Sequence, residues 1–290
     1  MSLRAKRNPA IRTSAGPPAI CGGNLSAWIA SPFGLAMTIF ILFIPKSLYP
    51  ATNNFSSRSP NQVTIEAPLP TLAVGEKLVY EVSWFGVPVG IGQLEVKEKT
   101  TMGGREAFHV TALARTNDFL SKLYPVVDEI HSWIDAENFH SLAFRKTLSE
   151  GRYRADETVA YDAAAKKGVY ESLHNKSKKE FPIEGPVHDL LSAFYWFRLQ
   201  NAKPGEVVKT VVNDDEKNWD LELRVLKYEE KELRGGQVIP AIQVEPRTRL
   251  KGILYNRGRA WVYFSADARR VPIWITIQTS FGPVVGVLKK

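Results

Sequence analysis

The chain has 290 residues, of which 44% are hydrophobic and 23% are charged, and its formal net charge is +8. This composition excludes an intrinsically disordered chain, because it supplies enough apolar material for one large core or two ordinary ones. Cys21 is the only cysteine, which excludes a disulfide scaffold, a thiolate metal site and a cysteine nucleophile in the rest of the chain.

The positive charge is concentrated near the N-terminus. Residues 1–50 carry five basic and no acidic side chains, namely Arg4, Lys6, Arg7, Arg12 and Lys46. The rest of the chain has 33 basic and 30 acidic residues, and a net charge of +3 is ordinary for a soluble domain. The charge therefore gives no reason to expect nucleic acid as a partner.

Residues 27–44, AWIASPFGLAMTIFILFI, contain no charged side chain. As a helix they would extend about 27 Å, close to the thickness of a bilayer core, so we predict a signal-anchor helix that contacts the membrane. A cleaved signal peptide with residues 33–44 as its apolar core is the alternative. It is slightly less favoured because Tyr49 occupies the place of a small residue if cleavage follows Ala51.

The regions on either side of this segment differ from a folded domain. Residues 1–26 are basic and are expected to be disordered, and residues 45–69 are rich in Pro, Asn and Ser, as in a flexible linker. These flanks argue against the remaining alternative, a buried core helix of a soluble protein. Cys21 precedes the apolar segment instead of following it, so acylation there is not expected.

The basic N-terminus should stay in the cytoplasm, and the chain beyond Lys46 should be exported across the bacterial cytoplasmic membrane. We therefore expect residues 70–290 to form a β-rich domain in the periplasm or cell envelope. An uncleaved helix at residues 27–44 would keep that domain anchored to the membrane.

The first exported segment has the period-two pattern of a half-buried strand. In Lys77–Trp84, the side chains Leu78, Tyr80, Val82 and Trp84 alternate with mostly polar ones. The same alternation recurs further along the chain, at Leu94–Val96, Phe108–Ala114, Trp219–Val225 and Ile273–Ile277. Turn residues separate these runs, at Gly103-Gly104, Asp162–Gly168, Asn213–Lys217, Gly235-Gly236 and Ala266–Arg270.

One clear helix is predicted over Asp189–Gln200, with Asp189 as its N-cap, and Phe119–Tyr124 favours a short second helix. One main helix cannot cover both faces of a sheet of about ten strands. The fold class is therefore mainly β. We predict a single strongly curved antiparallel sheet or open β-barrel, with the main helix packed on or in it and the hydrophobic helix preceding it.

Catalytic and cofactor motifs are missing from the sequence. No phosphate loop, zinc helix, nucleophile elbow or calcium loop occurs, so we expect no enzyme activity, cofactor or metal. The histidines are scattered singly, at His109, His131, His140, His174 and His188, and only folding could bring them together.

The segment His188–Arg198 is the most distinctive in the chain. Asp189, Tyr195 and Arg198 could converge as polar groups beside the aromatic wall of Trp196, as small-ligand sites are built. Tyr80 and Trp84 of the first strand complete the predicted ligand-binding set. The simpler interpretation, which we favour, is a capped helix that anchors the sheet, with Arg198 paired to a carboxylate.

A basic tract with one aromatic residue lies near the C-terminus. Arg247–Gly252, Tyr255 and Arg257–Arg259 are typical of an anion-binding surface or of a solvated hairpin face. Outside the cytoplasm, anionic lipid or polysaccharide would be the expected partner of such a surface.

Three blocks of the exported part resemble the bacterial family known as domain of unknown function 3108. They are Gly75–Trp84 with its Gly-Val-Pro-Val-Gly turn, Asp189–Arg198, and Asp267-x-Arg269-Arg270-x-Pro272. The resemblance spans about residues 70–290 and implies an exported envelope protein with a curved, barrel-like β fold. It supplies no activity and no catalytic residues. Similarity in shape to open-barrel carriers of lipoproteins is an analogy of fold only.

Three functions follow as hypotheses. The first is a non-enzymatic envelope protein that binds an apolar or amphipathic ligand, such as lipid or a lipidated chain, in its curved sheet. The second is a structural or assembly factor that docks a protein partner, whose identity is unknown, through an exposed sheet edge or an aromatic patch. The third is a hydrolase of envelope polymers, which would need a paired-carboxylate or Ser/His site in a cleft.

Overall fold

The computed structural model describes residues 72–289, apart from 215, 251–252, 256–258 and 280–281. The predicted N-terminal helix at 27–44 and the linker at 45–69 lie outside the described residues. Within the described ranges, neither helix has the length and apolarity needed to cross a bilayer.

Fifteen strands and two helices make up the described part of the chain. In chain order they are β1 (Lys77–Trp84), β2 (Val87–Met102), β3 (Arg105–Thr116), α2 (Asp118–Ser121), β4 (Val127–Asp135), β5 (Ser141–Glu150), β6 (Tyr153–Asp162), β7 (Lys167–Ser172), β8 (Ser177–Pro182), α3 (Leu190–Arg198), β9 (Val207–Asp214), β10 (Lys217–Glu232), β11 (Val238–Leu250), β12 (Ile253–Tyr255), β13 (Arg259–Ser265), β14 (Pro272–Thr279) and β15 (Gly282–Leu288).

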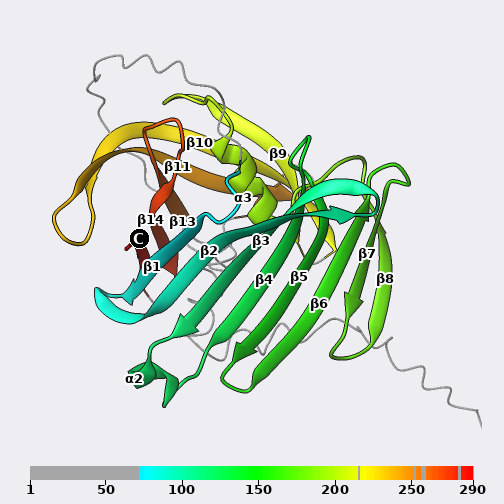
Figure 1. Ribbon diagram of the computed structural model, residues 1–290, viewed down its shortest axis with the longest axis horizontal. Coiled ribbons are helices and arrows are strands. Elements are labelled where there is room, and N and C mark those ends of the chain that lie inside the picture. Colours follow the sequence, from blue (N-terminus) through cyan, green and yellow to red (C-terminus); the bar gives the residue numbers. More distant parts are fainter. Residues whose placement is uncertain (1–71, 215, 251–252, 256–258, 280–281, 290) are drawn as a thin grey trace, which may run out of the picture.

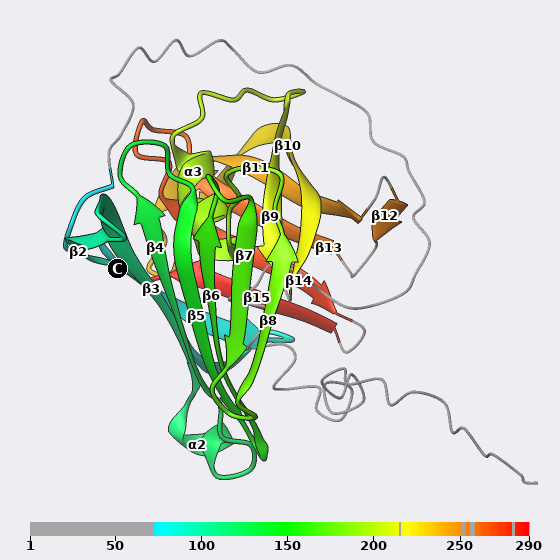
Figure 2. The same ribbon diagram turned by 90° about the vertical axis from the view of Figure 1, so that its right-hand side faces the viewer.

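All strands belong to one antiparallel sheet with the order β8-β7-β6-β5-β4-β3-β2-β1-β15-β14-β13-β11-β10-β9, and β12 pairs with β11 beside this path. The first and last strands are neighbours, because Tyr80 to Trp84 of β1 pair with Val284 to Leu288 of β15. The sheet curves until its edge strands β8 and β9 approach each other (Figures 1 and 2). No ladder joins those two edges within the described ranges, so the barrel is open.

The β8 and β9 ends of the sheet contact each other through side chains and through the segment that connects β8 to α3. Asn218 of β10 donates to the carbonyl of Pro182 in β8 over 2.9 Å, and Lys179 pairs with Glu216. His188, in the connection from β8 to α3, forms a parallel bridge with Val212 of β9. The connection therefore covers part of the β9 edge.

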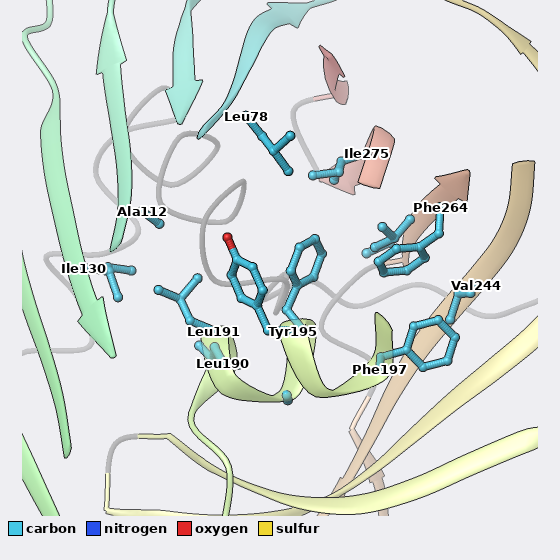
Figure 3. Packing of buried hydrophobic residues seen from close by; sticks show 14 of the residues in the cluster. Leu78, Ala112, Ile130, Leu190, Leu191, Tyr195, Phe197, Val244, Phe264 and Ile275 are labelled. Carbon is cyan, nitrogen blue, oxygen red and sulfur yellow. The ribbon is translucent and has the colours of Figure 1, made fainter. Parts of the chain in front are cut away.

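Helix α3 lies inside the curve of the sheet and contacts β3, β4 and β9 (Figure 1). Eight of its nine residues are buried and seven are apolar, which is typical of a helix enclosed by other elements. Tyr195 points from α3 towards Leu78 and Ala112, and Phe197 points towards Val244 (Figure 3). The predicted mainly β fold, with one main helix packed in a curved sheet, is confirmed.

The predicted number of strands, about ten, was too low. Several strands carry charged side chains on their inner face, so the apolar alternation is interrupted there. In β5, for example, Lys146 and Glu150 are buried on the same face as Phe144 and Leu148. A charged residue at an inner position breaks the apolar alternation by which a strand is predicted from the sequence.

Candidate functional site

Asp189 holds the start of α3 in a network of buried hydrogen bonds. Its Oδ1 accepts from the backbone N–H groups of Leu191 (2.8 Å) and Ser192 (2.9 Å), and the Ser192 hydroxyl accepts from the Asp189 N–H (2.9 Å). Its Oδ2 accepts from the hydroxyls of Ser132 (2.6 Å) and Ser141 (2.5 Å). The carboxylate therefore caps the helix and ties it to β4 and β5.

Burial raises the pKa of Asp189, and these hydrogen bonds oppose the rise. The neighbouring His188 is fully buried, and its pKa is lowered to about 3, first by burial and then by His140, with the Phe139 backbone acting in the opposite direction. His188 stacks on His140 with ring centroids 4.6 Å apart and lies 5.0 Å from Trp196. A neutral imidazole thus forms part of the packing around α3.

Arg198 closes the other end of α3 with an ion pair to the chain just before β1. Its guanidinium donates to both carboxylate oxygens of Glu76, over 2.5 and 2.8 Å, and to the carbonyl of Arg269 over 3.3 Å. Burial alone would lower the pKa of Arg198, but the bonds to Glu76 outweigh it and raise the pKa. The sequence-based interpretation of an anchoring helix with Arg198 paired to a carboxylate is confirmed.

Tyr80 and Tyr195 lie beside this ion pair in the core. The Arg198 guanidinium is 5.2 Å from the centre of the Tyr195 ring, and the Tyr80 hydroxyl donates to the carbonyl of Pro272 over 2.7 Å. Burial and then Tyr195 raise the pKa of Tyr80 well above its ordinary value. The Tyr195 hydroxyl is buried and has no hydrogen-bond partner in the described part of the chain.

The three sequence blocks that carry the family resemblance meet here, although they are far apart along the chain. The first supplies Glu76 and Tyr80, the second supplies Arg198, and the third supplies the carbonyls of Arg269 and Pro272. These blocks therefore describe a junction between β1, α3 and the β13–β14 turn.

Two of the predicted ligand-binding residues differ in their surroundings. Trp196 is half-buried on the side of α3 that faces His188. Trp84 is half-buried at the far end of β1, where its ring packs against Phe85 at 5.2 Å. The structure thus brings Tyr80, Tyr195 and Arg198 together, places Asp189 and Trp196 elsewhere along α3, and leaves Trp84 near the β1–β2 turn.

A second group of functional candidates lines the concave face of β5, β6 and β7 and was not foreseen. Lys146 pairs with Glu157 at 3.1 Å, with exposed side-chain fractions of only 7% and 18%. Tyr170 lies beside Glu157, and its pKa is raised first by burial and then by that carboxylate. Tyr161 donates to Asn213 of β9 over 3.1 Å. The sequence signal that could have predicted this polar wall is the alternation of charged and core residues, with Lys146 in β5 and Glu157 in β6.

The wall continues into a carboxyl pair at the other end of β5. Asp128 of β4 and Glu150 are both buried. Burial, and then Asp128, raise the pKa of Glu150 to about 9. Glu150 therefore retains its proton at neutral pH.

Folding pairs four of the five histidines that are scattered in the sequence. Besides His140 and His188, His109 Nε2 lies 2.9 Å from His131 Nδ1 on the convex face, and the pair stacks beside Trp133. Nevertheless, no group of three or more His, Cys, Asp or Glu side chains is placed to hold a metal ion in the described ranges.

Only part of the basic tract near the C-terminus lies among the residues whose side chains are described. Arg247 and Arg259 both bind the carboxylate of Glu245, over 2.8 and 3.2 Å. The two arginines of the tract whose side chains are described thus share a single carboxylate.

Comparison with solved structures gave matches of low identity. A β-barrel-like protein of a domain of unknown function, DUF1849, from Brucella abortus is 10% identical over 74% of this chain and 95% of its own, with a TM-score of 0.47. A candidate lipoprotein from Parabacteroides distasonis is 10% identical over 76% and 96%, with a TM-score of 0.33. A candidate exported protein with a YmcC-like fold from Bacteroides fragilis is 8% identical over 76% and 96%, with a TM-score of 0.30.

Comparison with curated proteins gave no match. The sequence profile of the family described as protein of unknown function (DUF3108) matches residues 79–289, which is most of the chain and includes the second and third of these blocks and the end of the first. The chain therefore belongs to the DUF3108 family.

Proposed function

We propose that this domain is exported to the cell envelope and binds an amphipathic ligand, a lipid or a lipidated chain, on the concave face of its sheet. The observation that carries the proposal is the change in character of that face. It is mainly apolar around α3, whereas along β5, β6 and β7 the polar groups Lys146, Glu157 and Tyr170 lie among apolar ones, and the two parts adjoin at β4.

The register of the strands places both parts on one face. Ile130 of β4, a core residue, lies opposite Lys146 of β5, and Val159 of β6 lies opposite Tyr170 of β7. Ser132, which binds the α3 cap, points to the same side as Ile130 because strand side chains alternate. An acyl chain along the apolar part would therefore place its polar head near Lys146 and Tyr170.

The Tyr195 hydroxyl supports a ligand in the apolar part. A buried hydroxyl without a partner costs about 1–3 kcal/mol, and a carbonyl or hydroxyl of a bound molecule would recover that energy. Trp196, half-buried on the side of the same helix that faces His188, offers a further aromatic surface. In this proposal Asp189 and Arg198 hold the helix in place instead of touching the ligand.

The two rival hypotheses gain less support. Edge docking would use β8, but its exposed run carries Lys178 and Lys179, and lysines on an edge strand discourage pairing with another chain. A hydrolase would need catalytic side chains that are hydrogen-bonded to one another and accessible to a substrate. The Asp189 carboxylate instead bonds to Ser132 and Ser141.

Mass spectrometry of ligands extracted from natively purified full-length protein tests the proposal. We expect an amphipathic lipid at near-stoichiometric amount, and we expect Tyr195→Phe to reduce its retention without lowering the stability of the fold. Tyr228→Phe, at an exposed tyrosine of β10, is the matched control. A protein free of lipid after gentle purification, which also fails to take up added lipid, would contradict the proposal.

A further inference from the structure

Exposed apolar side chains gather at one end of the sheet. Among the described residues, eleven large hydrophobic side chains are exposed, and five of them lie in the β1–β2 turn and in the connection from β3 to β4. These five, which we name the apolar tip, are Phe85, Val87, Phe119, Leu123 and Val127, with exposed fractions of 64%, 62%, 77%, 74% and 52%. Single exposed apolar residues are ordinary, but a cluster of this kind marks an interaction surface.

Hydrogen bonds hold the two segments of the apolar tip side by side. The side chain of Asn117 donates to the carbonyl of Pro88 over 2.9 Å, and its backbone N–H donates to the carbonyl of Val89 over 2.9 Å. Asn117 also caps the short helix α2 through its side chain, which accepts from the backbone of Leu120. The exposed Phe119 of α2 is therefore fixed beside the β1–β2 turn.

Phe85 occupies a strained position in this turn. Its φ is +49°, in the left-handed region where glycine or asparagine is favoured. One side of its ring packs against Gly282 of β15 and lies 5.2 Å from the Trp84 ring, while 64% of the residue is exposed. Such outliers concentrate at sites of function, and the exposed part of this ring is available to a partner outside the fold.

Basic residues surround the apolar tip. Arg115, Lys122, Arg152 and Arg154, which we name the basic collar, are exposed. The exposed acidic residues of the same described segments are Asp118 of α2 and Glu129, two residues beyond Val127 in β4. The β5–β6 turn that carries Arg152 is joined to the β3–β4 connection, since the Gly151 N–H donates to the carbonyl of Pro125 over 2.8 Å. The end of the sheet therefore combines apolar side chains with a net positive charge.

We propose that this end of the sheet docks onto an anionic lipid bilayer, with the apolar tip inserted at the interface and the basic collar against the headgroups. Aromatic and aliphatic side chains flanked by Lys and Arg are the combination that binds such surfaces. A bilayer fits better than a protein groove because the five side chains project from the β1–β2 turn, from the β3–β4 connection and from the first residues of β2 and β4, with charges around them. The inference extends beyond the ligand proposed above, and either one can fail alone.

A fluorophore placed at the tip tests the proposal in the full-length protein. Cys21→Ser removes the native thiol, and Leu123→Cys carries an environment-sensitive dye. Val238→Cys, exposed by 52% in the β10–β11 hairpin, is the matched control, since an N-terminal tether would bring both positions to the same vesicle. Vesicles consist of phosphatidylcholine with or without phosphatidylglycerol, and brominated lipids report contact.

We expect a blue shift and quenching at position 123, but not at position 238, with the phosphatidylglycerol vesicles. Arg115→Gln with Lys122→Gln should weaken this contact about fivefold for each charge removed, and high salt should act in the same direction. Phe119→Ser should weaken it about tenfold or more. Equal signals at both positions, or no signal at position 123, would overturn the proposal, as would crosslinking of the tip in cells to a protein and not to lipid.

Discussion

The half of the sheet around α3 and the wall formed by β4 to β8 differ in the side chains that they bury. Around α3 most buried groups are apolar, including Tyr195, Phe197 and Phe264 (Figure 3). The buried polar groups there lie at the two ends of the helix, at Asp189 and Arg198. Along the wall, Lys146, Asp128 and Glu150 are as deeply buried as core residues, with charged or proton-sharing partners. One sheet thus combines an interior stabilised by burial of apolar area with one that depends on pairing of charges.

The difference shows how one long open sheet can have a concave face with a mainly apolar part and a more polar part. Apolar burial needs only shape and volume, whereas each charge in the wall needs its own partner and responds to pH. We therefore expect substitutions in the two regions to differ in how much they change the free energy of unfolding and in how that change depends on pH.

The largest effect should come from the apolar half. Phe197 is 1% exposed and packs against Phe264 with ring centroids 5.0 Å apart. Phe197→Ala should lower the free energy of unfolding by about 3–5 kcal/mol, because it leaves a cavity that the sheet cannot close. Tyr170→Phe in the wall should change it by less than about 1.5 kcal/mol, the usual value of one hydrogen bond. Chemical denaturation measures both, and equal losses would contradict the contrast between the regions.

The junction at Arg198 should give the next largest effect. Arg198→Met leaves Glu76 without its partner and should lower the free energy of unfolding by about 3 kcal/mol. The double variant with Glu76→Gln should recover part of the loss, because it removes the unpaired charge. A double-mutant cycle from denaturant titrations measures the coupling, and strictly additive losses would show that the pair contributes no interaction energy.

The wall should lose stability as pH rises. The pKa of Glu150 is about 9 in the folded state against an ordinary value of 4.5, so the folded protein retains a proton that the unfolded chain releases. The contribution is complete below pH 4.5 and is lost as pH approaches 9, with a slope of at most about 1.4 kcal/mol per pH unit. Glu150→Gln should flatten this decline in thermal unfolding between pH 5 and pH 9. An unchanged slope would mean that Glu150 titrates normally.

The region around α3 should lose stability in acid instead. The pKa of His188 is about 3 in the folded state, against an ordinary value of 6.5. Between these two pH values the unfolded chain binds a proton at His188, whereas the folded protein does not. Stability from this residue is present above pH 6.5 and falls as pH drops towards 3. His188→Gln should reduce the acid sensitivity between these values. The comparison uses the same thermal scans, with His174→Gln as a control at an exposed histidine.

The sequence by itself determined the elements whose side chains alternate cleanly or follow a helical period. The β1–β2 hairpin, the turns and the N-cap at Asp189 could be predicted because local patterns specify them. The pairing of Arg198 with a carboxylate could also be anticipated, since a buried cation requires a counter-charge.

Only the tertiary structure decided which groups meet. Strand register placed Lys146 opposite Glu157, and the curvature of the sheet brought Tyr161 of β6 to Asn213 of β9. The strands of the wall were under-counted because paired charges replaced apolar residues at their inner positions. The local sequence determines the alternation of side chains along a strand. The partner of a buried charge depends on strand register and sheet curvature, which involve residues far away along the chain.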